Sequence, residues 1–222
     1  MKDVYVNSTL DRLTDEIKML EDRARSKEVT NRVLSVRYLR SLLPSSITID
    51  LLVKKYLETF ETTYRVLHVP TFWNEYQRFC DSPSGSNSDM EALLLAILAC
   101  VLCTSTHDNT KYNPNGSIFR SKAIVWIKAC ETWLKRQSNK HKTMVTIQVR
   151  TLRILALMTT CMKTKEIYQE TQAHMAFMRA SGFHRDPSIL SSRCSVFEGE
   201  MRRRLWATAV ELEVQTSIDK GK

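Results

Sequence analysis

The sequence predicts an all-α fold, an irregular multi-helix bundle of about seven helices around a buried central helix. Five Gly and five Pro in 222 residues are about half the average share, which disfavours turn-rich β architectures. Apolar residues recur at three- and four-residue steps, and no stretch keeps the alternation of a half-buried strand. Twelve consecutive apolar residues, Ala92 to Cys103, are too few to span a bilayer and are typical of a helix buried on all sides.

Residues 1–44 are predicted to form an N-terminal helical arm or linker. One face of this arm carries a regular apolar stripe, formed by Leu10, Leu13, Ile17, Leu20 and Ala24. A second stripe runs from Ile49 through Phe60 and predicts a second helix that ends before His68.

Capping signals place the remaining helices. Ser88 followed by Glu91 has the spacing of a capping box, so Ser88 is the predicted N-cap of the central helix. Ser195 and Glu198 repeat this spacing before a final helix that reaches about Gln215. Three further helices are predicted between these two, over about residues 117–137, 143–162 and 165–181.

The positive charge is concentrated in one segment. The chain has a formal net charge of +9, yet residues 109–165 hold twelve Lys or Arg and one acid, Glu131. Such a segment can attract nucleic acid, anionic lipid or an acidic protein over a long range. The solvated outer face of ordinary helices is the more common explanation.

No metal, cofactor or catalytic site is predicted. Cys100 and Cys103 have the C-x-x-C spacing of zinc and redox sites, but they lie in the apolar run and no second pair follows at ligand spacing. The six cysteines are therefore interpreted as reduced thiols, those two as inert core residues. The chain also lacks a nucleophile elbow, an H-E-x-x-H motif and glycine-rich nucleotide loops, so it is predicted not to be an enzyme. An all-α enzyme with dispersed catalytic groups stays open as an alternative.

Three consecutive arginines form the sharpest local basic cluster. On a helix, Arg202, Arg203 and Arg204 fan over about 200° and cannot all face one ligand. Each is predicted to pair within its own helix, Arg202 with Glu198 and the other two with Glu200.

Two further motifs are interpreted as structural. Gly182 is predicted to end a helix as its left-handed residue, and Asp186 to accept backbone hydrogen bonds in the turn that follows. Trp206 is predicted to be a packing anchor of the final helix. A set of methionines is expected in the core, although it would also suit a small-molecule pocket: Met158, Met162, Met175 and Met178.

Three blocks of the sequence resemble the fungal-specific transcription factor domain, the regulatory region that follows the binuclear zinc cluster of fungal activators and repressors. Residues 51–79, LLVKKYLETFETTYRVLHVPTFWNEYQRF, resemble the opening helix and the His-x-Pro-x-Phe turn of that family. GFHRDP, residues 182–187, resembles its G-[LF]-H-R-D-P signature, and FEGEMRRRLW, residues 197–206, resembles its F-x-x-E-x-R-R-R-[LI]-W helix. The matching positions are the candidate structural or regulatory residues: His68, Pro70, Phe72, Gly182, His184, Arg185, Asp186, Pro187, Glu200, Arg202, Arg203, Arg204 and Trp206.

The chain departs from the family pattern at several positions. Ala207 stands where the family usually has a second aromatic residue, and the acid that often follows is Glu211 or Glu213. A D-x-G-x-P element begins at Asp219 and is cut by the end of the sequence, and no zinc-cluster cysteine pattern precedes the domain.

The resemblance implies a regulatory domain over residues 45–222, incomplete at its C-terminus. It implies a nuclear transcription regulator whose DNA reading and zinc belong to a cluster absent from this chain. Its expected partners are transcription machinery or regulatory proteins, with DNA contacted only indirectly or weakly, no membrane, and room for a small-molecule effector or self-association. An incomplete domain is expected to aggregate or oligomerise when expressed alone. The alternative function is a stand-alone basic helical module that binds nucleic acid through residues 109–165.

Overall fold

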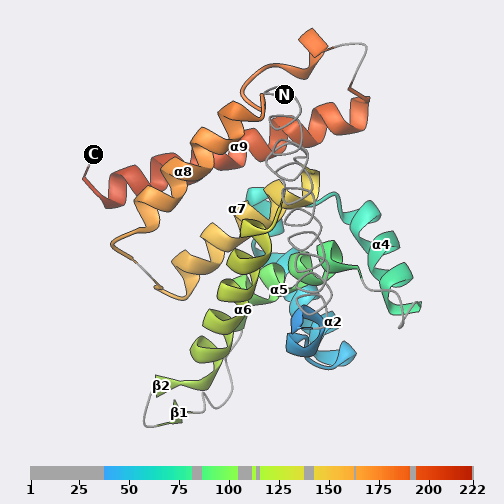
Figure 1. Cartoon of the computed structure of the whole chain (residues 1–222), viewed down its shortest axis with the longest axis vertical. Coiled ribbons are helices and arrows are strands. Elements are labelled where there is room, and N and C mark those ends of the chain that lie inside the picture. The colour runs from blue at the N-terminus through green and yellow to red at the C-terminus, as the bar shows by residue number, and fades with distance from the viewer. Residues whose placement is uncertain are drawn as a thin grey trace, which may run out of the picture. The chain divides into compact units, whose positions relative to one another are not determined.

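The computed structural model describes residues 38–81, 87–104, 112–113, 116–137, 143–162, 164–190 and 194–221. The chain divides into two compact units, residues 1–38 and 39–222. The apolar stripe predicted for the N-terminal arm lies outside the described residues. The described part of the second unit is all-α, as predicted, apart from one pair of two-residue strands (Figure 1).

The elements follow one another as short to medium helices. A helical segment ending at Leu42 comes first. The others are α2 (Ser46–Thr59), α3 (Glu61–Tyr64), α4 (Val69–Asp81), α5 (Ser88–Leu102), β1 (Tyr112–Asn113), β2 (Gly116–Ser117), α6 (Ile118–Lys135), α7 (Met144–Thr159), α8 (Ile167–Ala180), the 3-10 helix η1 (Pro187–Leu190) and α9 (Val196–Asp219).

Helix α5 is the central element, as its apolar run predicts. Every residue from Met90 to Leu102 is buried. Because α5 has no polar face, it needs neighbours all around it, and it packs against α2, α4, α6 and α7. Helix α7 in turn contacts α6, α8 and α9, so the last two helices reach the core through α7.

The predicted N-cap of α5 was wrong by one residue. The side-chain oxygen of Asn87 accepts a hydrogen bond from the Met90 amide at 3.2 Å, so Asn87 is the N-cap and Ser88 is the first helical residue. Asn87 lies one residue before Ser88, and its side chain reaches the free amides of the first turn. The Ser88 hydroxyl donates to the Asp89 carboxylate instead. Glu91 does not complete a capping box, because its carboxylate is buried.

The predicted N-cap Ser195 is confirmed, and Ser117 and Thr143, where two further helices were predicted to begin, are N-caps as well. Side-chain oxygens of Ser117, Thr143 and Ser195 each accept a hydrogen bond from the amide three residues later and begin α6, α7 and α9. The final helix extends beyond the predicted Gln215, to Asp219.

Helix α4 was not predicted. The His-x-Pro-x-Phe segment, interpreted as a turn, leads directly into it: Pro70 lies in its first turn, where no helical hydrogen bond needs a proline N–H. His68 precedes α4, and its Nδ1 lies 2.7 Å from the Thr71 hydroxyl. Ahead of this segment, the predicted second helix breaks into α2 and the one-turn α3, which ends at Arg65 in the left-handed region, with φ +47°.

Glu91 is a buried acid in the first turn of α5. Its side chain is fully buried, neither carboxylate oxygen has a hydrogen bond, and Arg40 is 3.9 Å away. Burial raises the pKa of Glu91 to about 7, while the positive charge of Arg40 opposes the shift. A carboxyl whose pKa is higher in the folded than in the unfolded state stabilises the fold below its ordinary value of 4.5, and this stabilisation is lost as the pH rises through about 7.

We expect Glu91→Gln to raise the free energy of unfolding at pH 8, by on the order of 1–3 kcal/mol, because it removes a buried charge. The gain should shrink towards pH 5, where Glu91 is already neutral. Urea melts at both pH values measure the difference. Glu58→Gln, at an exposed carboxyl of α2, is the control and should change stability equally little at both pH values. A gain that is the same at pH 5 and pH 8 would contradict the buried-charge explanation.

Candidate regulatory site at the junction of the last two helices

Helix α8 ends in a closed hydrogen-bonded turn at Gly182. The Gly182 amide donates to the Arg179 carbonyl at 3.0 Å, and the Phe183 amide donates to the Met178 carbonyl at 3.0 Å. Gly182 has φ +72°, a left-handed conformation that glycine adopts without the Cβ penalty of other residues. The predicted helix end is therefore confirmed, and the chain is redirected towards α9.

Arg202 of α9 binds this helix end. Its Nη2 donates to the Gly182 carbonyl at 3.0 Å and the Ser181 carbonyl at 3.4 Å, and its guanidinium lies 4.2 Å from the centre of the Phe183 ring. The predicted pair with Glu198 was wrong. The last carbonyls of α8 have no helical partners, so they offer acceptors that attract a guanidinium, and Phe183 adds a stacking surface.

The other two arginines diverge from Arg202. Arg203 donates from Nη2 to Asp186 Oδ1 at 3.1 Å, so its predicted pair with Glu200 was wrong as well. The turn after Gly182 brings Asp186 across to α9, which sequence spacing could not reveal. Arg204 does bond Glu200, at 2.9 Å, as predicted. The three guanidinium groups point to the end of α8, the connecting turn and their own helix, in keeping with the predicted fan.

Asp186 fixes the connecting turn. Its Oδ1 accepts the Ser188 amide at 2.8 Å, which confirms the predicted backbone role. The hydrogen bond from Ser188, and after it the one from Arg203, hold the pKa of Asp186 below its usual range. The hydrogen bond from Arg204 likewise lowers the pKa of Glu200.

Trp206 and His184 meet at the outer side of the junction. Their ring centres are 6.1 Å apart, and Trp206 is half-buried against the core. The buried anchors of α9 are instead Met201, Leu205, Ala209 and Leu212. Trp206 thus packs against the core and also contacts His184 of the connecting turn. Arg185 of the same turn is exposed.

Gly199 is a contact residue that the sequence analysis missed. A Cβ on this residue would lie 3.2 Å from the Pro187 Cβ, a tight contact, so glycine lets α9 approach η1 this closely without a shift of Pro187. Glycine inside a helix was the available signal, because it weakens a helix unless packing requires it. Pro187 itself is buried at the start of η1.

The opening block contacts α9 at two further places. The His68 ring lies edge-on to the Phe197 ring, with centres 4.8 Å apart. The Thr208 hydroxyl donates to the Tyr64 carbonyl, a contact also missed from the sequence. Phe72 is buried and stacks with Tyr76. The three sequence blocks therefore meet along α9 (Figure 1).

A buried acid supports the loop between α3 and α4. Glu61 accepts hydrogen bonds from the Tyr56 hydroxyl and the Leu67 amide, both at 2.9 Å. Burial raises the pKa of Glu61 to about 7, while the two hydrogen bonds oppose the shift. Glu61 thus joins α2 to the start of the His-x-Pro-x-Phe segment.

The motif residues fall inside a segment that matches the model of a known protein family. The family model described as "Fungal specific transcription factor domain" matches residues 53–222. The chain belongs to this family. The match includes all thirteen candidate positions named above, from His68 to Trp206.

Curated relatives of this fungal transcription factor domain are much longer proteins. "Transcription factor opdR" of Penicillium oxalicum is 34% identical over 180 residues, which are 81% of this chain and 22% of the relative. "Transcription factor lepE" of Aspergillus flavus is 30% identical over 200 residues, 90% and 24% of the two chains. "Zn(2)-C6 fungal-type transcription factor mpsB" of Macrophomina phaseolina is 27% identical over 195 residues, 81% and 24%. The chain spans less than a quarter of each relative, and no solved structure matches it significantly.

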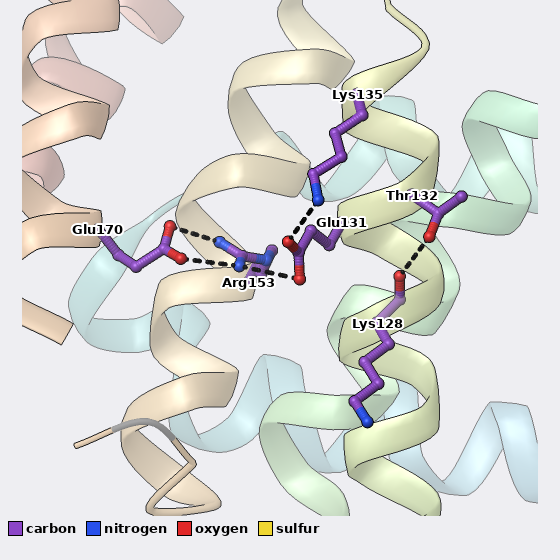
Figure 2. A network of polar contacts seen from close by, with 6 residues as sticks. All are labelled: Lys128, Glu131, Thr132, Lys135, Arg153 and Glu170. Carbon is purple, nitrogen blue, oxygen red and sulfur yellow. Dashed lines mark hydrogen bonds and ion pairs between the residues drawn. The ribbon is translucent and has the colours of Figure 1, made fainter. Parts of the chain in front are cut away.

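One arginine of the basic segment of this domain points inward and joins the neighbouring helices (Figure 2). Arg153 of α7, only 8% exposed, donates to both carboxylate oxygens of Glu170 in α8 at 2.9 and 3.1 Å. It also lies 3.5 Å from Glu131 of α6, which Lys135 contacts at 2.9 Å. One guanidinium therefore joins three helices.

Two further arginines of the segment have internal roles. Arg120 Nε donates to the Thr160 carbonyl at the end of α7, at 2.8 Å. The Arg150 guanidinium stacks on the Phe177 ring of α8 at 4.0 Å. These contacts favour the structural explanation of the charge excess over a surface for nucleic acid.

The C-x-x-C pair has the environment expected of core cysteines. Cys100 is buried and its thiol donates to the Leu152 carbonyl at 3.2 Å, and burial raises the pKa of both Cys100 and Cys103. Within the described ranges, no three His, Cys, Asp or Glu side chains come close enough to hold a metal ion. None of the described helices is long and apolar enough to cross a membrane.

We expect Arg202→Lys to lower the free energy of unfolding by about 1–2 kcal/mol, because an ammonium lacks the planar group that stacks on Phe183 while Nη2 donates to the two carbonyls. Arg185→Lys, at an exposed neighbouring arginine, should stay within about 0.5 kcal/mol of the parent chain. Chemical denaturation of the two variants side by side gives the comparison. Equal effects would show that the Arg202 contact contributes nothing specific.

We expect the purified chain to hold no stoichiometric zinc, because Cys100 is committed to the core and burial disfavours its thiolate. Elemental analysis after extended dialysis tests this. One tightly held zinc ion per chain would contradict the interpretation of the C-x-x-C pair.

Proposed function

We propose that the chain is the regulatory and interaction portion of a nuclear fungal transcription factor. In this proposal, a zinc cluster elsewhere in the whole protein reads DNA, and the portion described here binds no metal and catalyses no reaction. The observation that carries the proposal is the family match over residues 53–222, within which the motif residues form one contact network. The three relatives described above are named as transcription factors, which supports the proposal.

The contacts of α9 suit a region that relays a change of packing. Arg203 and Asp186 form an exposed pair, as do Arg204 and Glu200 at the helix surface, and such pairs contribute little stability. The contact of Arg202 with the end of α8 is partly buried and directional. A partner that rotates α9 would break the exposed pair of Arg203 with Asp186 at small cost, while Arg202 keeps the two helices joined and the pair of Arg204 with Glu200 moves with α9.

A second candidate function is a stand-alone nucleic-acid-binding module that uses the basic segment. It is favoured only by the charge excess, and the internal contacts of Arg120, Arg150 and Arg153 weaken it. Binding of labelled duplex DNA at rising salt separates the candidates. The regulatory proposal expects weak binding that disappears at physiological salt, whereas discrimination of about a hundredfold between two duplexes would favour the module.

A fusion experiment tests the regulatory proposal directly. The chain is placed between a heterologous DNA-binding domain and an acidic activation domain, and reporter transcription is measured in yeast. We expect lower output than from a flexible linker of equal length. Asp186→Ala, which removes the oxygen that accepts both the Ser188 amide and Arg203, should move the output towards that of the linker.

Glu58→Gln, at an exposed position of α2, is the matched control and should leave the restrained output unchanged. Output from the parent fusion that equals the output from the linker would contradict the proposed regulatory function.

A further inference from the structure

An open groove of about 530 Å³ lies between the end of α3 and the middle of α9. Three arginines line it, Arg65, Arg203 and Arg204, against one lining acid, Glu211. The volume lies within the range of ligand pockets, about 300–1,000 Å³. The groove therefore combines a ligand-sized hollow with an excess of positive charge.

Arg65 is the cation available for a ligand. It is exposed, and within the described part of the chain its guanidinium makes no hydrogen bond or close ion pair, although its charge helps to lower the pKa of Glu200. Its backbone adopts φ +47°, an uncommon conformation for a residue with a Cβ, and its amide donates to the Glu61 carbonyl at 3.2 Å. Backbone of this kind persists where the surroundings impose it, and it occurs often at binding sites. The Glu61 side chain is buried and accepts a hydrogen bond from the Tyr56 hydroxyl, which fixes the residue that the Arg65 amide bonds.

The other two cations can accept a ligand without a large loss. Arg203 and its partner Asp186 are 51% and 56% exposed, and Arg204 and Glu200 are 32% and 49% exposed. Exposed pairs contribute about 0–1 kcal/mol, so a ligand anion can replace either acid with little penalty. Arg204 uses only its Nε in the pair with Glu200, which leaves its terminal nitrogens facing the groove side of α9.

The floor of the groove depends on a small residue. Ala207 lines it, at the position where the family pattern usually has an aromatic residue. A ring there would occupy space that the methyl group leaves open. Tyr64 adds an apolar wall, while Glu211, which accepts a hydrogen bond from Gln215 at 2.8 Å, disfavours an anion at its own end.

We propose that this groove binds a small organic anion, with a phosphate or carboxylate group held by Arg65, Arg203 and Arg204 and an apolar body over Ala207. A hollow of this size favours a small ligand over an extended acidic peptide, which needs a longer charged surface. Occupancy would compete with Asp186 for Arg203 and so loosen the turn between α8 and α9. The regulatory meaning of that coupling rests on the proposed function, but the binding itself does not.

Calorimetric titration of the 222-residue chain at constant ionic strength tests the site, with pyrophosphate and citrate as probes and sodium chloride as the reference. We expect saturable binding of at least one probe, at one ion per chain and a dissociation constant below about 1 mM. The two probes distinguish a phosphate from a carboxylate ligand. Arg65→Gln should weaken binding at least about fivefold, and Ala207→Phe, which fills the groove and keeps every charge, at least about tenfold.

Two matched controls accompany these variants. Lys128→Gln removes an exposed positive charge on α6, and Ala207→Ser changes the groove floor by one atom, and both should bind within about twofold of the parent chain. If Ala207→Phe fails to fold by circular dichroism, Arg65→Gln decides the outcome.

Three results would overturn the proposal: no saturable binding of either probe, equal binding by the parent chain and Arg65→Gln, or binding of an acidic octapeptide alone. The last would point to a protein partner. Because the titration uses no DNA or reporter, its failure leaves the regulatory function untouched, and failure of the fusion experiment leaves the site untouched.

Discussion

The fold depends on the burial of one helix that has no polar face. Between Met90 and Leu102 every side chain of α5 is buried, and a helix of this kind is stable only when other elements cover it on all sides. Helices α2, α6 and α7 provide that cover with their own apolar stripes. The position of α7 then decides where α8 and α9 pack, so the junction that carries the family motifs is placed indirectly by an apolar run almost 80 residues earlier in the chain.

The second constraint is electrostatic. Moving Arg153 out of water is unfavourable unless its charge is matched, and Glu131 and Glu170 match it from the two neighbouring helices. A contact of this geometry contributes to register more than to stability, because it is satisfied only when α6, α7 and α8 lie in one arrangement. Arg153 therefore adds to the net charge of residues 109–165 without adding a cation to the surface, whereas Lys122, Lys128 and Lys135 of the same segment are exposed. Helical cations that point inward contribute to the net charge but not to the outer potential.

Local signals predicted the elements well, and tertiary partners poorly. The N-cap Ser195 acts through the next few amides, so its spacing from Glu198 identified it, and the predicted starts of α6 and α7 fall at their N-caps, Ser117 and Thr143. The pairs of Arg202 and Arg203 could not be predicted, since the end of α8 and Asp186 come close only after the chain turns at Gly182. The motif residues could be named from the sequence, whereas Gly199 and Thr208, which set the approach of α9, became visible only in the packed structure.

The junction of α8 and α9 combines contacts of unequal strength. The Arg202 contact joins a partly buried guanidinium to the carbonyls of Ser181 and Gly182, so breaking it removes these hydrogen bonds, although the Gly182 carbonyl also accepts the Arg185 amide at 3.3 Å. The Arg203 and Arg204 pairs are exposed, and water replaces each partner readily. Helix α9 is therefore held by its buried side chains and by Arg202, and it is adjustable only on the side that carries the exposed pair of Arg203 with Asp186. The adjustable side is also the side that faces the groove with Arg65, so a charge arriving there acts on the weakest contacts of the junction first.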